Sequence, residues 1–399
     1  MLQATISWPG GGSLADATIA LVKLIRRISL TKVSPRSLPT GRASSARFAD
    51  SMSLLAMATL TFINCSCRCS FHWGPTVRTP SRRAMKRVSG FSRLLAVLAL
   101  GLIAGALLSP TAAEAKKLNV VTSTTDLAAL TEEVGGDKVN VESIAKGYQD
   151  PHFVEAKPSF LLKLRQADLL IAVGLQLEIG WLPPLITQSG NPRIQVGATG
   201  YLDASQFAEI LEIPQGTVTR AEGDVHPLGN PHYWLDPDNG RRIARGIANK
   251  LADMDTADGA FFQQRFQDFE KRLLAAEQKW DAEMKPYRGR KVVTYHRSLP
   301  NFAKHFALDV IGYVEPRPGI PPTPSHTLEL IQLMKRENCK IILVEPYFDL
   351  KTPQSIARET GAQVVVYLPS VGGVKEVTTY FQLFDYDIAL LTKAFQSTQ

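Results

Sequence analysis

The chain has 399 residues, a formal net charge of +8 at pH 7 and four cysteines. The positive charge is concentrated at the start, because residues 1–115 carry 14 Lys/Arg and 3 Asp/Glu, which leaves 31 and 34 for the other 284 residues. A body with a slight negative charge excludes the nucleic-acid and anionic-membrane binding that the overall charge would suggest.

Residues 85–115 have the pattern of a secretory signal peptide. Lys86 and Arg87 provide a positive start, an apolar stretch covers 94–108, and a small-x-small cleavage site ends at Ala115. The apolar stretch is shorter than the roughly 20 residues of a transmembrane helix. No cysteine follows it, so a lipid anchor is not indicated. We therefore predict a soluble protein exported to the periplasm.

Residues 1–84 precede this signal, although a signal peptide normally begins a chain. We interpret them as a disordered upstream extension from a start codon placed too early, with Met85 as the true start. A translated cytosolic or anchoring extension is the alternative. Three cysteines lie here at alternate positions (65–69), a spacing unlike that of structural zinc sites. The exported body keeps only Cys339, so its stability must come from a hydrophobic core.

The first part of this body predicts strands and helices in alternation, which indicates a parallel α/β lobe. In such lobes ligands bind beyond the carboxyl ends of the strands, where the loop Asp150-Pro151-His152 falls. The predicted strands cover 118–123, 139–144, 168–173 and 193–196. The predicted helices cover 126–134, pass through 161–164 and begin at 181.

A polar loop from Gln215 to Gly229, which contains His226, leads to the segment Asn-Pro-His-Tyr-Trp-Leu-Asp-Pro at 230–237. Asp236 can cap a helix and the following proline suits its first position, which predicts a helix to about residue 251. His232 is therefore expected in a stiff loop directly before a helix.

Apolar residues recur at steps of three and four over the next stretch, which predicts one long helix with a buried stripe. The stripe contains no Gly or Pro joint, so we expect a stiff connection and a small motion between lobes. Its members are Phe262, Phe266, Phe269, Leu273, Ala276 and Trp280.

A second α/β series follows, so the predicted fold consists of two parallel-sheet α/β lobes joined by one long helix. We assign 116–254 to the first lobe, 255–287 to the linking helix and 288–399 to the second lobe. One predicted strand ends directly at His296 and another at Glu345. The predicted strands cover 291–295, 310–314, 341–344 and 364–368, and the helices cover 302–306, 326–336, 353–360 and 380–394.

Three histidines thus lie at strand ends or helix starts: His152, His232 and His296. Neutral imidazole is the usual ligand of borderline divalent metals, and three of them define most of a tetrahedral zinc site. They are far apart in the sequence, so only a fold that brings both lobes together could cluster them. Three histidines and an open position are also the layout of a zinc hydrolase, although no HExxH helix is present.

These motifs, together with the long helix, resemble the periplasmic zinc/manganese-binding proteins of ABC importers, the cluster A-I (cluster 9) solute-binding family. The resemblance covers residues 118–399. It implies a C-clamp of two lobes on a rigid helix, with His152 and His232 from the first lobe and His296 from the second around one metal ion. Zinc relatives place a histidine at the third position and manganese relatives tend to place a carboxylate, so His296 favours zinc.

The fourth position departs from the family, because the stretch at 368–373 has no carboxylate where many members carry an aspartate. Glu345 is our substitute candidate and Asp349 a weaker one, and a water molecule is the third option. Glu345 could equally hold a histidine from behind. His226 is expected at the surface rather than on the metal.

Structural roles are expected for His305, on a helix, for His326, at a helix start, and for Glu155, in a first turn.

The resemblance implies a binding protein, not an enzyme, that captures Zn(II), with Mn(II) as the other option, and delivers it to an inner-membrane ABC permease with its ATPase. We expect a monomer that binds no nucleic acid. A manganese- or iron-specific member of the same family and the three-histidine hydrolase remain alternatives. An adhesin, as among surface-displayed relatives, is disfavoured without a lipid anchor.

Overall fold

The computed structural model describes residues 116–216, 218–219, 223 and 225–398, and the fold is given for these residues. The expected signal peptide (85–115) and upstream extension (1–84) lie outside them. Within the described part, no helix combines the length and the apolar character needed to cross a bilayer.

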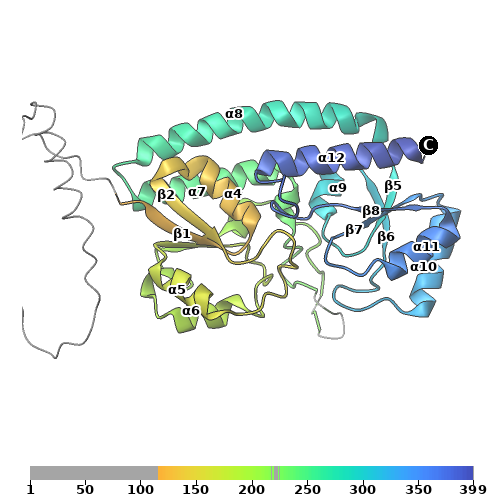
Figure 1. Cartoon of the computed structure of the whole chain (residues 1–399), viewed down its shortest axis with the longest axis horizontal. Helices are drawn as coiled ribbons and strands as arrows, with labels where there is room; N and C mark the ends of the chain where they lie inside the picture. The colour runs from red at the N-terminus through yellow and green to blue at the C-terminus, as the bar shows by residue number, and fades with distance from the viewer. Residues whose placement is uncertain (1–115, 217, 220–222, 224, 399) are drawn as a thin grey trace, which may run out of the picture. The chain divides into compact units, whose positions relative to one another are not determined.

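The first lobe contains a parallel four-stranded sheet in the order β2-β1-β3-β4. Helix α4 covers one face together with α7, whereas α5 and α6 lie on the other (Figure 1). The strands are β1 (Leu118–Thr122), β2 (Val139–Ser143), β3 (Leu169–Ala172) and β4 (Tyr201–Asp203). The helices are α4 (Thr125–Gly135), α5 (Pro158–Gln166), α6 (Leu182–Ser189) and α7 (Pro237–Met254), with the short helices η1 (Gly136–Lys138), η2 (Pro192–Ile194), η3 (Ala204–Phe207) and η5 (Tyr233–Leu235).

The strand predicted at 193–196 is wrong. Residues Pro192–Ile194 form η2, and only Ile194 of this stretch enters the core, whereas Val196 is exposed. The side chain of Asn191 accepts a hydrogen bond from the Arg193 N–H at 3.1 Å and so starts this turn. The fourth strand is β4, in which Leu202 pairs with Ile171 of β3.

The second lobe repeats the arrangement with the sheet order β6-β5-β7-β8, again all parallel. Each lobe therefore places its first strand in the interior of the sheet, between its second and third strands. The strands are β5 (Lys291–Thr294), β6 (Asp309–Tyr313), β7 (Ile341–Val344) and β8 (Gln363–Val366). The helices are α9 (Pro300–Phe306), α10 (Pro324–Arg336), α11 (Lys351–Thr360) and α12 (Tyr380–Ser397).

The two lobes are joined by α8 (Gly259–Met284) and the short η6 (Lys285–Tyr287), so the predicted two-lobed α/β fold on one long helix is confirmed. The predicted apolar stripe faces the core, with Phe262, Phe269 and Trp280 fully buried. Helix α12 runs beside α8 across the joint and makes a second brace that the sequence did not indicate (Figure 1).

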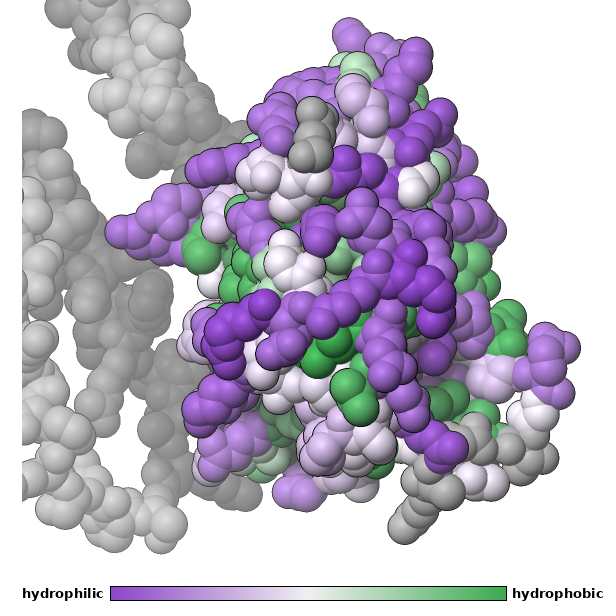
Figure 2. Space-filling model, turned by 90° about the vertical axis from the view of Figure 1, so that its right-hand side faces the viewer, coloured by the Kyte–Doolittle hydropathy of each residue, from purple (hydrophilic) through white to green (hydrophobic). Residues whose placement is uncertain are grey.

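One hydrophobic core runs through both lobes. A single cluster of buried side chains extends from Val120 of β1 to Phe395 of α12, and smaller clusters fill the outer side of each lobe. On the end of the molecule shown in Figure 2, hydrophilic side chains dominate the surface. Because the shared core would have to be sheared for the lobes to separate, we expect the joint to be stiff.

A turn of the second lobe, 369–373, is bound to the first lobe. The Trp234 indole donates to the Pro369 carbonyl at 2.9 Å, the Val371 N–H donates to Asp126 at 2.9 Å, and the Thr125 hydroxyl donates to the Val371 carbonyl at 2.6 Å. Gly147 packs so closely that a Cβ there would lie 2.0 Å from the Val371 oxygen. The loop that leads to His152 is thereby held against the other lobe.

Candidate metal centre

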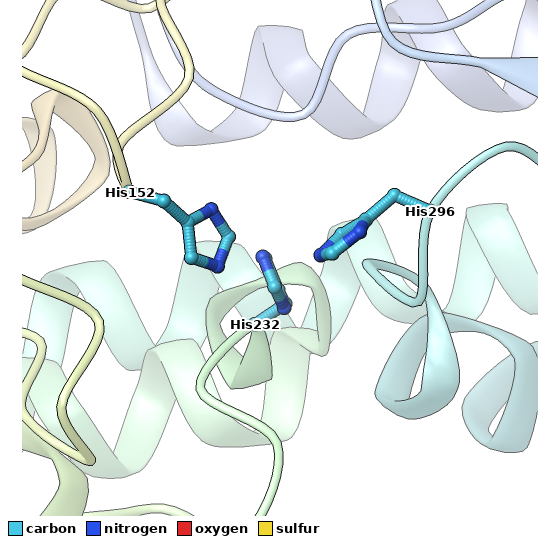
Figure 3. A group of neighbouring side chains, drawn as sticks. All are labelled: His152, His232 and His296. Atoms are coloured by element: carbon cyan, nitrogen blue, oxygen red, sulfur yellow. The ribbon is translucent and has the colours of Figure 1, made fainter. Parts of the chain in front are cut away.

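His152, His232 and His296 come together between the lobes, and their rings point toward one another (Figure 3). The ring centroids are 5.1 Å apart for His152 and His232, 5.3 Å for His152 and His296, and 5.2 Å for His232 and His296. The donor atoms of the three side chains all lie within 4.8 Å of one another. Two segments of the first lobe and one of the second thus build an almost equilateral triangle.

In each ring, the Nδ1 atom is already engaged. It lies 2.7 Å from Asp150 Oδ1 in His152, 2.9 Å from Asn230 Oδ1 in His232 and 2.8 Å from Glu315 Oε2 in His296. A carboxylate or amide oxygen beside Nδ1 requires the proton on that atom and leaves Nε2 as a lone-pair donor, as in metal-binding histidines. Consistent with this, His232 Nε2 is buried and has no hydrogen-bond partner.

The size of the triangle fits a small tetrahedral ion. A tetrahedral zinc about 2.0–2.1 Å from each ring nitrogen would place the ring centroids roughly 5.2 Å apart and the nitrogens roughly 3.3 Å apart. The observed centroid separations of 5.1–5.3 Å agree with the first value. The side chains as they stand can therefore hold such an ion without rebuilding the cleft.

Two of these supports follow from a short local motif. In Asp150-Pro151-His152 and in Asn230-Pro231-His232, the side-chain oxygen of the first residue accepts both the backbone N–H, at 2.9 Å in each case, and the Nδ1–H of the histidine. The intervening proline restricts the backbone of this turn. The motif therefore fixes the ring orientation and the tautomer at once, and its repetition in the sequence could have revealed this role.

The pKa values of His232 and His296 are shifted in opposite directions. Burial, together with the neighbouring His152 and His296, lowers the pKa of His232 well below its usual value, so that ring is neutral. Burial also opposes protonation of His296, but the hydrogen bond to Glu315 and the charges of Glu345 and Glu315 outweigh it and raise the pKa of His296. Of these two rings, His296 is the more basic imidazole, which is the stronger donor to a metal when deprotonated.

Glu345 is fully buried behind the triangle and is not part of the group of close donors. Its Oε1 accepts hydrogen bonds from the hydroxyls of Ser298 and, at 2.8 Å, Tyr367, whereas its Oε2 has no partner. Burial raises the pKa of Glu345, opposed by the charge of His296. The other sequence candidate, Asp349, is exposed and accepts a hydrogen bond from the Lys351 N–H at 2.8 Å.

His226 lies closer to the site than the sequence suggested. Its Nε2 is 3.3 Å from His152 Nε2, a separation that two ligands of one tetrahedral ion could have, but His226 is outside the group of three whose donor atoms all lie within 4.8 Å of one another. Burial and the neighbouring His152 lower the pKa of His226 to about 3, so the ring is neutral. It belongs to a loop without regular structure, and no local pattern in the sequence indicates where such a loop folds back.

Two cavities flank the triangle. One, of about 480 Å³, is lined from both lobes by His226, His232 and His296 among others. The other, of about 700 Å³, lies on the first lobe beside His152 and His226, with Glu155 exposed at its edge. The site is therefore reachable from solvent.

The two other histidines among the described residues have different partners. His326 Nε2 lies 2.9 Å from the Tyr313 carbonyl, and His305 Nδ1 lies 3.0 Å from Asp236 Oδ1. Asp236 also caps α7 by accepting the Asp238 N–H at 2.9 Å, as the sequence predicted.

A rigid two-lobed α/β fold with a cluster of imidazoles between the lobes defines the class of solute-binding proteins that hold metal ions. A protein-family model described as zinc-uptake complex component A, periplasmic (ZnuA), matches residues 120–394, and the chain belongs to this family.

Individual relatives of this chain are also named as metal-binding or metal-transport proteins. The manganese ABC transporter substrate-binding lipoprotein PsaA of Streptococcus pneumoniae is 25% identical over 285 residues, which cover 70% of this chain and 88% of that protein. The iron-binding protein YfeA of Yersinia pestis is 26% identical over 298 residues, with 70% and 87% covered. A crystal structure of ZnuA matches with a TM-score of 0.60 at 25% identity and covers 70% of this chain and 99% of that one.

Such proteins are substrate-binding components of metal ABC transporters and not enzymes, so the resemblance drawn from the motifs is confirmed and the hydrolase alternative has no support. A substrate-binding component works with a membrane permease and its ATPase. The names of the relatives specify different metals, and the chemistry of this chain's own donors has to decide which one it carries.

Proposed function

We propose that this protein captures Zn(II) between its lobes and delivers it to the permease of an ABC importer. The observation that carries the proposal is the triangle of His152, His232 and His296, in which each Nδ1 is engaged and the rings converge. Among the described residues no carboxylate joins this group. Imidazole donors suit zinc, whereas manganese prefers oxygen ligands, so the donor set favours zinc.

For the fourth position we propose His226 or Glu345 as the donor. His226 is supported by the 3.3 Å between its Nε2 and that of His152. Glu345 is supported by its unpartnered, buried Oε2 and its electrostatic contact with His296. Asp349 has less support, because its carboxylate is exposed and engaged by Lys351. Replacing His226 by alanine and Glu345 by glutamine, one at a time, separates the two, since loss of the true donor should change the Co(II) absorption spectrum far more than loss of the other side chain.

Delivery in the periplasm is supported by the predicted cleavage after Ala115 and by the description of the family as periplasmic. We propose that the exported protein acts as a monomer and meets its metal outside the inner membrane. A manganese-specific protein is the second candidate, because PsaA is named for manganese.

The test is a competitive titration of the metal-free protein with Zn(II) and Mn(II), repeated on His296→Ala. Tight one-to-one zinc binding, weaker manganese binding and loss of both in His296→Ala would support the proposal. His326→Ala is the control, because His326 lies in the same lobe but bonds the Tyr313 carbonyl instead of facing the triangle.

Preferential manganese binding would support the second candidate function, a manganese-specific binding protein, over the zinc-specific one. Binding of neither metal, by a folded protein, would overturn the transport function altogether.

A further inference from the structure

The segments that carry His232 and His296 also contact each other away from the three histidines of the triangle, through the residues that follow them in the sequence. Asp236 follows His232 by one short turn, η5, and His305 lies near the end of α9, the first helix after His296. His305 Nδ1 donates to Asp236 Oδ1 at 3.0 Å, and the two side chains are only 14% and 8% exposed. One hydrogen bond therefore joins the two segments across the lobe boundary.

His305 also faces the linking helix. Its Nε2 lies 3.8 Å from Asp281 Oδ1 of α8, so the ring stands between the cap of α7 and the helix that joins the lobes. Burial opposes protonation of His305, but the hydrogen bond with Asp236 and the charges of Asp236 and Asp281 outweigh it and raise its pKa. The pair thus has a charge-assisted character, which strengthens such bonds.

The rest of α9 is fixed to the first lobe in the same way. Asn301 donates to the Glu209 carbonyl at 3.0 Å, and Lys304 forms an ion pair with the Glu209 carboxylate. Helix α9 packs directly against η5 (Tyr233–Leu235), which lies between His232 and Asp236. Although α9 belongs to the second lobe by sequence, its polar contacts bind it to the first.

We propose that Asp236 and His305 form a positioning pair that sets the distance between His232 and His296 and thereby favours a small tetrahedral ion; this inference rests on the proposed function. The connecting segments are short and most of their residues are buried, so a shift of α9 along η5 should move His296 relative to His232. A wider triangle suits an ion that completes a larger shell with water, and the pair therefore acts on selectivity as well as affinity.

The pair is not itself a metal site. A carboxylate oxygen of Asp238 lies with the Asp236 and His305 atoms inside 4.8 Å, but Asp238 is engaged by Arg241 Nη2 at 2.5 Å. Asp236 Oδ1 already accepts both the Asp238 N–H and the His305 Nδ1–H. These side chains are therefore already engaged, by Arg241 and the cap of α7 and by the bond between Asp236 and His305.

The experiment compares two substitutions of His305 in the whole protein. His305→Leu removes both ring nitrogens, whereas His305→Asn places an amide nitrogen where Nδ1 stood and keeps the bond to Asp236. We expect His305→Leu to weaken zinc binding about tenfold, in the range of groups that support metal ligands. Manganese binding should change less, and the visible band of the Co(II)-loaded protein should weaken as tetrahedral geometry is lost. His305→Asn should restore most of each value.

His326→Leu is the matched control, because it also removes a half-buried histidine of the second lobe from a hydrogen bond. If His305→Leu lowers only the melting temperature and keeps zinc affinity and the Co(II) band, the pair is merely structural and the inference is overturned. It is also overturned if His305→Asn behaves like His305→Leu while remaining folded. Failure of the unmodified protein to bind zinc would instead overturn the proposed function.

Discussion

The two lobes place buried polar groups at the same point of their sheets, but they differ in how the carboxylate there is hydrogen-bonded. Each sheet has its topological switch point beside its first strand, where α/β proteins bind ligands. In the first lobe this point is closed by Ser123, Glu178 and the Tyr233 hydroxyl, which donates to the Val173 carbonyl at 2.5 Å. In the second lobe it is occupied by Ser298, Glu345 and Tyr367.

The difference lies in the carboxylates. Both oxygens of Glu178 accept backbone N–H groups, from Val173 at 2.7 Å and Gly174 at 3.1 Å. Glu345 uses one oxygen for two hydroxyls and keeps the other buried without a partner, beside His296. The carboxylate at the first switch point therefore has both oxygens engaged, whereas the one at the second switch point keeps one buried oxygen without a partner.

The largest effect should come from removing one imidazole from each side. His232→Ala and His296→Ala should each weaken zinc binding by more than the roughly 10–100-fold that loss of a supporting group costs, because each deletes a ligand. Isothermal titration with a competing chelator measures both. If His296→Ala left the affinity intact, the site would belong to the first lobe alone and the comparison would fail.

The next effect separates the two buried carboxylates. Glu345→Gln should lower zinc affinity roughly 10–100-fold, because it removes a charge beside His296. Glu178→Gln should leave the affinity unchanged and lower stability by about 1–3 kcal/mol, since its amide would face a backbone N–H. Affinity and chemical denaturation are measured on both variants. Equal losses of affinity would show that the two switch points play the same part.

The last effect is on stability alone and concerns Asp126, which holds the turn of the second lobe. Burial raises its pKa to about 7, from 3.8 as the ordinary value. Between these values the folded chain holds a proton that the unfolded chain has released, so stability falls as pH rises, by about 1.4 kcal/mol per pH unit. Asp126→Asn removes this slope. Its stability relative to the unmodified protein should therefore improve from pH 5 to pH 7 in urea unfolding, and parallel curves would contradict the assignment.

The sequence predicted most of the fold because its periodicities are strong. The stripe around Phe262 and Trp280 and the cap at Asp236 each depend on local residues, and both were found. The predicted strand at 193–196 failed because its pattern is too short to separate a strand from an irregular turn. The real strand, β4, has three residues and is defined by pairing with β3.

The residues of the candidate site also fall into those that a local sequence pattern indicates and those that it does not. His152 and His232 carry their supports two residues upstream, so the sequence contains both the ring and the means of aiming it. Glu315, the support of His296, is 19 residues away, and His226 is 74 residues from His152. Such contacts depend on how segments that are distant in the sequence fold together within one lobe, which no local pattern encodes.

The core that runs from β1 to α12 has a consequence for how the molecule melts. Since neither lobe keeps a complete interior without the other, they should lose structure together, in one calorimetric peak whose van't Hoff and calorimetric enthalpies agree. A ligand bound between them would raise the temperature of that single peak and would not split it. The two lobes should thus behave as one cooperative folding unit.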